Sequence, residues 1–461
     1  MNIKSFENIY LIGIGGIGMS SLARFFVSQN KKVFGYDKVK TSLTIELENQ
    51  GIEISYKDDI ETIPSIFNQK HEDQLVVYSS AISNNNIFSF FSNNSFSICK
   101  RADALGLISK YYYTIAIAGT HGKTTTSIML SHILKSSDVD CTAFFGGISK
   151  NYNTNFLLSE TSKYMIVEAD EYDKSFLTLS PDIAVITSLD ADHLDVYNSH
   201  EEFINTFQEF IFQVKENGYL IIEESIVNYF EKPKHVKLLT YSSSSSSTSD
   251  YYISEISQKD NSFHFTYHTK DTSVNSKDIV LPMLGTHNLS NALAAISVCD
   301  LLNVNHNSIS SSFSKFEGIN RRFDIHISNK KIVYIDDYAH HPEEIKSTIS
   351  GIIDSFPERK LTVIFQPHLF SRTKDFAKEF AQSLSQADEL ILLDIYPARE
   401  EPIFGVDSKM LLDLCTNDSK IIFKNNELLS HLKDNKKDVV VTLGAGNISD
   451  LVKPIVSILD I

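Results

Sequence analysis

Short apolar runs recur along the chain, and each one stops at a glycine or at a cluster of polar residues. Unbroken runs of valine, isoleucine and leucine are typical of parallel strands that are buried on both faces. Helix-like stretches separate most of these runs, and this alternation predicts an α/β protein built on parallel sheets. The runs cover 9–12, 75–82, 114–118, 164–168, 182–187, 331–335, 361–365, 390–394 and 439–443.

The pattern divides the chain into three parts. A length of 461 residues is too great for a single core. We expect a Rossmann-like domain at 1–106, a central P-loop-type α/β domain at 107–317 and a second Rossmann-like domain at 318–461. Alternating apolar and polar residues at 251–267 predict a β-hairpin inserted in the central domain.

The run 114–118 ends in a glycine-rich loop followed by a lysine, two threonines and a helix-like stretch. Strand, glycine loop, Lys-Thr and helix are the parts of a phosphate cradle, in which backbone amides and the lysine bind phosphate oxygens and a threonine hydroxyl binds Mg²⁺. An ordinary turn with a surface lysine would not need this register. We therefore predict a nucleoside-triphosphate site at Gly119, Thr120, His121, Gly122, Lys123, Thr124 and Thr125.

A second glycine turn follows the run 9–12. Its glycines have the spacing of a dinucleotide site, and Asp37 ends the next strand, where an acid could bind a ribose. NAD is the simplest ligand for such a turn, but the same turn suits any diphosphate, including a nucleotide sugar. We assign this site to Gly13, Gly15, Gly16 and Gly18, with Asp37 and, after the following strand, Ser79.

Two acidic clusters follow strands of the central domain. Glu168 comes directly off the run 164–168, and an acid at that edge beside a Lys-Thr loop can hold the Mg²⁺ that bridges phosphate oxygens. His193 lies between Asp192 and Asp195. From the residues alone it is equally a metal ligand or a salt-bridged surface histidine, because carboxylates are the usual Mg²⁺ ligands.

Further candidates lie nearer the C-terminus. Asn288 and Asn291 are three apart at the start of a predicted helix, so they share a face; they are helix caps or bind the edges of adenine. In the last domain, motifs follow four strands, and together they indicate a second ligand-facing edge. They are Asp336-Asp-Tyr-Ala-His-His-Pro342, Gln366-Pro-His-Leu-Phe-Ser-Arg-Thr373, Ile395-Tyr-Pro-Ala-Arg-Glu400 and Gly444-Ala-Gly-Asn447.

Composition excludes several classes of protein. The formal charge of −16 argues against a nucleic-acid surface. The four cysteines are scattered, without the spacing of a zinc site or a disulfide framework. No apolar run approaches the roughly 20 residues that span a bilayer, and the N-terminus reads directly into a strand. We expect a cytoplasmic protein without nucleic-acid or membrane partners.

The combined motifs resemble the Mur ligases. The resemblance rests on Gly-Thr-His-Gly-Lys-Thr-Thr at 119–125, Glu-Ala-Asp-Glu at 168–171, Asp-His-Leu-Asp at 192–195, Gly-Thr-His-Asn at 285–288, Arg-Arg-Phe at 321–323 and the motif at 336–342. It extends over all three expected domains. The turn at 13–18, together with Gln-Pro-His and Arg-Thr at 366–373 and Gly-Ala-Gly-Asn at 444–447, makes the chain most similar to the alanine-adding branch.

The resemblance implies a reaction in which ATP activates the carboxylate of UDP-N-acetylmuramate as an acyl phosphate, which the amine of L-alanine then attacks. It implies that Glu168 and His193 serve two Mg²⁺ ions, in addition to the Thr124 hydroxyl of the phosphate loop. It also implies that Asn288 holds adenine and that Arg322 and Asp337 complete the ATP site. The turn at 13–18 would then bind the uridine diphosphate rather than NAD. His341 and Arg372 would face the amino acid.

The chain departs from the family pattern at two places. Sister ligases carry a carbamylated lysine shortly after the Asp-His motif, but no lysine lies between His193 and Lys215. Many alanine-adding members have an arginine where this chain has Leu369, so the number of carboxylate-binding arginines differs from that pattern. We predict that Arg372 is the carboxylate clamp; the alternative is a surface arginine paired with Asp375. The nearest alternative function is that of a relative that reattaches recycled murein tripeptide to the same nucleotide sugar. A dehydrogenase would explain the first glycine turn but not Lys123.

Overall fold

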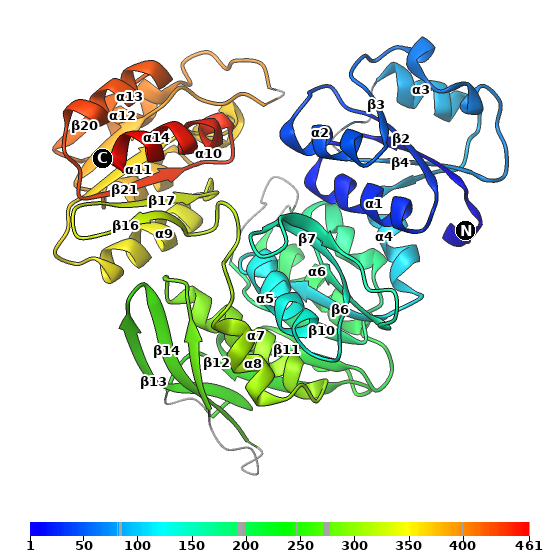
Figure 1. Cartoon of the computed structure of the whole chain (residues 1–461), viewed down its shortest axis with the longest axis horizontal. Helices are drawn as coiled ribbons and strands as arrows, with labels where there is room; N and C mark the ends of the chain where they lie inside the picture. The colour runs from blue at the N-terminus through cyan, green and yellow to red at the C-terminus, as the bar shows by residue number, and fades with distance from the viewer. Residues whose placement is uncertain are drawn as a thin grey trace. The chain divides into compact units, whose positions relative to one another are not determined.

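The computed structural model describes residues 1–80, 82, 85–190, 197, 199–245, 248–270, 277–398 and 400–460. Over these residues the chain forms helices and strands around three sheets, which confirms the expected α/β class (Figure 1). They group into two compact units. The first contains 1–259, 263–281 and 289–317, and the second contains 260–262, 282–288 and 318–461.

The N-terminal sheet of the first unit has the order β3-β2-β1-β4-β5, and its paired strands are parallel. The central strand β1 is buried at every position, as an unbroken apolar run requires. The strands are β1 (Asn8–Ile12), β2 (Lys32–Tyr36), β3 (Glu53–Ser55), β4 (Gln74–Tyr78) and β5 (Ile98–Lys100). The helices are α1 (Ile17–Ser28), α2 (Ser42–Asn49), α3 (Asn86–Asn93) and α4 (Arg101–Ser109).

The second sheet of this unit has the order β15-β14-β13-β12-β11-β10-β6-β9-β7-β8, with the expected hairpin β13–β14 near one edge. Its strands are β6 (Tyr113–Ala118), β7 (Thr142–Ser149), β8 (Thr154–Leu157), β9 (Tyr164–Glu168), β10 (Ile183–Ile186), β11 (Tyr219–Glu223), β12 (Lys237–Ser242), β13 (Tyr251–Lys259), β14 (Ser262–Thr269) and β15 (Lys277–Leu281). The helices are α5 (Lys123–Lys135), α6 (His200–Phe212), α7 (His287–Leu301) and α8 (His306–Phe313), with the 3-10 segments η4 (Tyr172–Thr178) and η5 (Glu224–Tyr229).

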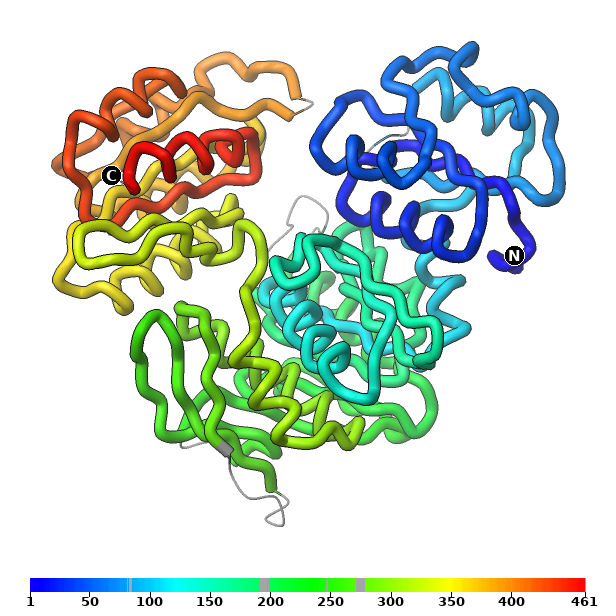
Figure 2. Tube along the Cα trace, viewed as in Figure 1, coloured from blue at the N-terminus to red at the C-terminus, as the bar shows by residue number. Residues whose placement is uncertain are grey.

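Helices α1 and α4 join these two sheets into one unit. Phe25 of α1 packs edge-on or tilted against Phe144 and Phe156, and the Asn155 amide donates to the carbonyl of Ile17 at 2.6 Å. Gly106, where we placed the first domain boundary, lies inside α4 rather than in a linker. Figure 2 shows the chain passing through α4 and directly into β6.

The sheet of the second unit has the order β16-β17-β21-β18-β19-β20, with β16 antiparallel at its edge. The four motif-bearing strands β17, β21, β18 and β19 are neighbours and parallel, so their carboxyl ends share one edge as expected. The strands are β16 (Asp324–Ser328), β17 (Val333–Asp337), β18 (Leu361–Phe365), β19 (Glu389–Leu392), β20 (Ser419–Ile422) and β21 (Val439–Leu443). The helices are α9 (Pro342–Ser355), α10 (Phe370–Asp375), α11 (Ala377–Leu384), α12 (Ser408–Leu414), α13 (Asn425–Asp434) and α14 (Val452–Leu459).

Within the described ranges, no helix combines the length and the apolar character needed to cross a membrane.

Candidate active site

The phosphate loop connects β6 to α5 and depends on two glycines. Gly119 has a φ of +130° and Gly122 a φ of +83°, in a region that other residues rarely adopt. A side chain on Gly119 would also collide with the hydroxyl of Thr187. Gly122 is the N-cap of α5, so Lys123 begins a helix whose first amides are available to an anion.

Polar residues directly after β10 hold this loop in place. The Ser188 hydroxyl accepts a hydrogen bond from the His121 amide at 2.8 Å, and the Thr120 hydroxyl accepts one from the Asp190 amide at 2.9 Å. The His121 carbonyl accepts another from the Thr187 hydroxyl. Sequence reasoning missed these hydrogen bonds, although the polar cluster after β10 indicated that its residues lie at the same sheet edge as the phosphate loop.

Lys123 is held by a buried acid that the sequence reasoning also missed. Its ammonium donates to both carboxylate oxygens of Glu171, at 2.8 and 2.9 Å, and to the carbonyls of Gly119 and Thr120. The side chain of Glu171 is 0% exposed. Burial lowers the pKa of Lys123, but the carboxylates of Glu171 and Asp170 raise it, and the net shift is upward. The lysine therefore stays a cation within the loop.

Two of the predicted metal ligands lie side by side. The Thr124 hydroxyl donates to Glu168 Oε2 at 3.0 Å, and Glu168 Oε1 accepts from the Gly146 amide at 2.6 Å. A side chain on Gly146 would lie 2.5 Å from Glu168 Oε2 and would displace the carboxylate from its present position. Hydroxyl and carboxylate oxygens are the donors that Mg²⁺ prefers.

The third predicted metal ligand, His193, lies outside the described residues, as do Asp192 and Asp195. Among the described residues, no group of three or more histidine, cysteine or acidic side chains is arranged to hold a metal ion. The pair of Thr124 and Glu168 is therefore the part of the predicted metal site that the structure describes.

Asn288 and Asn291 both lie inside α7 rather than before its first residue, so neither is its N-cap. The Asn288 amide donates to the carbonyl of Leu284 at 2.7 Å, and Asn291 accepts from the Thr126 hydroxyl at 3.4 Å. A side chain on Gly122 would collide with the Asn291 amide oxygen. Asn291 thus packs directly against the phosphate loop.

The N-terminal glycine turn joins β1 to α1 and leaves two amides unused. Those of Gly13, Gly15 and Gly16 donate to acceptors within or beside the turn. Those of Ile17 and Gly18, at the start of α1, donate to no acceptor in the described part of the chain. Unused amides at a helix N-terminus bind anions, since they align with the positive end of the helix dipole.

Asp37 and Ser79 border this turn from the neighbouring strands. Asp37 Oδ2 accepts from the Gly15 amide at 2.8 Å and Oδ1 from the Val39 amide at 3.2 Å. Its carboxylate therefore orients the turn, while the ribose contact stays a prediction. A side chain on Gly13 would lie 3.3 Å from the Ser79 Cβ, which places Ser79 at the mouth of the turn.

In the second unit, Asp337 supports the loop that carries Arg322. The Asp337 carboxylate accepts from the amides of Phe323 and Ala339, both at 2.7 Å. Burial raises its pKa to about 6, although Arg322 and these amides oppose the shift. The Arg322 guanidinium lies 3.7 Å from Glu344 and against the ring of Tyr338.

Arg372 lies on α10, which follows β18 at the edge formed by the carboxyl ends of the parallel strands of the same unit. Among the described residues, its guanidinium makes no hydrogen bond or ion pair, and the expected alternative pair with Asp375 is not formed. Leu369, the N-cap of α10, has a φ of +70°, an uncommon conformation for leucine. Glu400 anchors the start of the helix by accepting from the Ser371 amide at 3.0 Å.

Two histidines, His340 and His368, lie beside Arg372. The rings of His340 and His368 are 5.9 Å apart, and His368 also stacks on Tyr396. Burial, the neighbouring His340 and the charge of Arg372 lower the pKa of His368 to about 4. The predicted residue His341 is 7% exposed and packs edge-on against Phe376. Sequence reasoning named His341 and Arg372 with their neighbours, and His340 and His368 are among these neighbours.

Family models of three Mur ligase domains match most of the chain. The Mur ligase family catalytic domain matches residues 8–113, the Mur ligase middle domain matches 117–299, and the Mur ligase glutamate ligase domain matches 321–446.

Individual relatives match over nearly the whole length. The UDP-N-acetylmuramate–L-alanine ligase of Cytophaga hutchinsonii is 43% identical over 459 residues, which is 99% of this chain and 97% of the relative. The crystal structure of a UDP-N-acetylmuramate–alanine ligase from Thermotoga maritima has a TM-score of 0.80 at 25% identity, with 98% of both chains covered. A murein peptide ligase from Psychrobacter arcticus has a TM-score of 0.72 at 23% identity, also with 98% of both covered, and at that identity shows the fold alone.

Proposed function

Because the chain belongs to the Mur ligase family, we propose that it is an ATP-dependent ligase that joins L-alanine to UDP-N-acetylmuramate in peptidoglycan precursor synthesis. The match at 43% identity over nearly the full length of a ligase with that name carries the proposal. The lactyl carboxylate takes the γ-phosphoryl group of ATP and ADP leaves. The alanine ammonium loses one proton to solvent or to a base, and the resulting amine attacks the acyl carbon. Phosphate leaves, and the nitrogen loses a second proton to become the amide N–H.

The phosphate loop supports the first step. Backbone amides at the start of α5 and the Lys123 ammonium present positive charge where the transferring phosphoryl group gains negative charge. Lys123 already lies in a fixed position because Glu171 and the loop carbonyls hold it. An ammonium has three N–H donors, so Lys123 must release one of these four acceptors to bind a phosphate oxygen.

Thr124 and Glu168 fit a magnesium ion, and we propose that they hold it together with His193. Their oxygens are adjacent and match the donor preference of the ion. When bound, Mg²⁺ supplies charge neutralisation between phosphate oxygens. Glu168 is itself fixed by the Gly146 amide, which keeps its second oxygen directed at Thr124.

The turn at 13–18 is proposed to bind the diphosphate of the nucleotide sugar. The unused amides of Ile17 and Gly18 support an anion there, and Asp37 and Ser79 border the site. In the second unit, Arg372 is proposed to bind the alanine carboxylate through paired hydrogen bonds. The roles of Asn288, Asn291, Arg322 and Asp337 in ATP binding, and of His341 at the amino acid, stay predictions.

A panel of substrates tests the proposal. Phosphate release should require ATP, UDP-N-acetylmuramate and L-alanine together, and UDP-N-acetylglucosamine, which lacks the lactyl carboxylate, should not replace the muramate. Rapid phosphate release with murein tripeptide and little with alanine would instead establish the recycling activity.

A further inference from the structure

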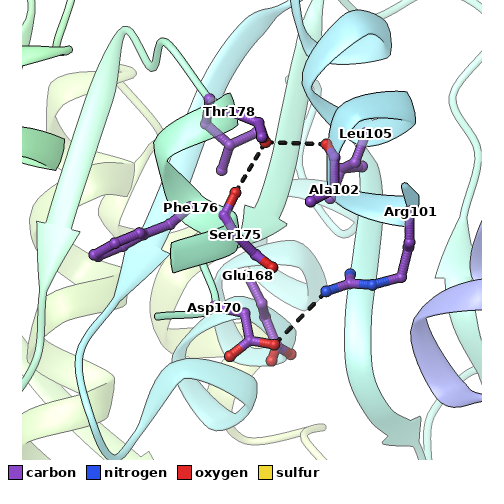
Figure 3. A pocket seen from close by; sticks show the side chains of 9 residues that line it. Arg101, Ala102, Leu105, Glu168, Asp170, Ser175, Phe176 and Thr178 are labelled. Carbon is purple, nitrogen blue, oxygen red and sulfur yellow. Dashed lines mark hydrogen bonds and ion pairs between the residues drawn. The ribbon is translucent and has the colours of Figure 1, made fainter. Parts of the chain in front are cut away.

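A small pocket lies beside Glu168 in the first unit, where α4 meets the segment that follows β9 (Figure 3). Neither the motifs nor the proposed reaction assigns a role to the cation at its rim, Arg101. The pocket is lined by Arg101, Ala102, Leu105, Glu168, Asp170, Ser175, Phe176, Thr178 and Leu179.

Arg101 is loosely held for a partly buried cation. Its guanidinium lies 3.6 Å from Asp170, its side chain is 27% exposed, and in the described part of the chain it donates no hydrogen bond. Figure 3 shows it directed across the pocket toward Asp170 and Glu168. The adjacent Lys100, by contrast, is 46% exposed and donates to Asp173 at 3.0 Å. Arg101 therefore retains most of its donors for another partner.

The same guanidinium lies against the glycine turn. A Cβ on Gly18 would be 3.0 Å from Arg101 Nη1, so the guanidinium touches the first turn of α1. The amides of Ile17 and Gly18 there have no acceptor among the described residues. Two unused amides, a helix N-terminus and a guanidinium with free donors thus meet at one place.

The backbone around Arg101 is fixed. Arg101 is the first residue of α4, directly after β5, at the same sheet edge as the glycine turn. The Thr178 hydroxyl donates to the carbonyl of Ala102 at 3.0 Å, and a side chain on Gly106 would lie 2.5 Å from the Thr178 carbonyl oxygen. The position of the backbone that carries Arg101 is therefore built into the junction of α4 and η4.

We propose that Arg101 binds the diphosphate of the nucleotide sugar, together with the amides of Ile17 and Gly18, and exchanges its distant Asp170 partner for phosphate oxygens. A guanidinium can donate two parallel hydrogen bonds to a phosphate, which makes this contact directional as well as electrostatic. The inference deepens the proposed function and rests on it. It adds a cationic side chain to a turn whose other proposed anion donors are backbone amides.

Titration calorimetry with UDP as the probe isolates the diphosphate from the sugar and the lactyl carboxylate. Arg101→Gln should weaken UDP binding and UDP-N-acetylmuramate binding by a similar factor, about tenfold or more, and Arg101→Lys by less. ATP binding should not change. Lys100→Gln removes the same charge from the neighbouring residue and should leave UDP binding within about twofold of wild type. Melting curves show whether each variant is folded.

UDP binding by a folded Arg101→Gln protein as tight as that of wild type would overturn the proposal. Weakening of the muramyl nucleotide alone would also overturn it, because the arginine would then contact the lactyl carboxylate or the sugar. An equal loss with Lys100→Gln would show a general charge effect instead of a contact. If wild type binds neither UDP nor the muramyl nucleotide, the proposed function itself fails, and that result is distinct from a defect confined to the variant.

Discussion

Lys123 of the phosphate-loop motif forms a largely buried ion pair with Glu171 in the candidate site. The Glu171 side chain is fully buried, and both of its carboxylate oxygens accept hydrogen bonds from the Lys123 ammonium. These contacts fix the position of the ammonium. A buried pair of this kind is costly to separate because either partner alone would be an uncompensated charge. Substitutions at Lys123 and at Glu171 should therefore change the activity in different ways.

Lys123→Ala should reduce turnover by at least about a hundredfold, because a lost charge contact at a transferring phosphoryl group costs roughly 3 kcal/mol. The measurement is phosphate release at saturating substrates. A melting curve shows whether the variant is folded, and near-normal turnover by a folded variant would refute the assignment of this loop.

Glu171→Gln should leave the lysine in place but change its proton affinity. Burial lowers the pKa of Lys123, and Glu171 opposes that effect. Without the carboxylate the folded-state pKa falls, so the cation is lost earlier as pH rises. The alkaline limb of the kcat profile should move down by about one pH unit, and an unmoved limb would show that Glu171 has only a structural role.

Arg372→Lys keeps the charge of the proposed clamp but loses the planar fork. The KM for alanine should rise about tenfold, equivalent to roughly 1.4 kcal/mol, while the KM for ATP changes little. Since Leu369 cannot act as a second clamp, the loss is not shared with another arginine at that position. An unchanged KM for alanine would show that Arg372 is not the clamp.

At the scale of elements, the site is assembled from the carboxyl ends of parallel strands and the helices that follow them. β9 ends at a residue of the candidate site, β1 and β6 are each followed directly by one, and β17, β21, β18 and β19 share one edge. The glycines matter where the backbone turns sharply at these ends. Gly119 and Gly122 need their positive φ angles, and Gly15 admits Asp37 and Thr44.

Gly15→Val tests the element formed by β1, the glycine turn and α1. Even a Cβ at this position would lie 2.8 Å from Thr44 Cγ2 and 2.9 Å from Asp37 Oδ2. The turn should be displaced, and binding of UDP-N-acetylmuramate should weaken by about tenfold or more. ATP binding to the same protein is the internal control. Unchanged nucleotide-sugar binding, or tight binding of NAD to wild type, would contradict the assignment of this turn.

For the whole molecule, the class of fold and the order of the apolar strands and motifs along the chain could be predicted from the sequence. Apolar runs predict buried parallel strands directly, and the Lys-Thr loop has a strict local register. Contacts made across elements were not predictable in the same way. Glu171 reaching Lys123, Arg101 reaching Gly18 and His368 reaching His340 each join residues that are distant in sequence, and no local spacing reports such pairs.

The same limit explains the choice between His340 and His341. These two residues are adjacent in one motif, just before α9. In the structure the His341 ring packs against Phe376, and the His340 ring lies beside His368. The predicted boundary at Gly106 falls within α4, which continues through that residue.

An acyl-phosphate intermediate must transfer a carboxylate oxygen to phosphate, and isotope labelling measures that transfer. UDP-N-acetylmuramate labelled with ¹⁸O in both lactyl carboxylate oxygens would be incubated with ATP and L-alanine. The account predicts an alanyl product that retains one ¹⁸O in the new amide carbonyl, and inorganic phosphate that carries the other, because phosphate departs with the oxygen that attacked ATP. Unlabelled phosphate, or no alanyl product while ATP is consumed, would contradict the account.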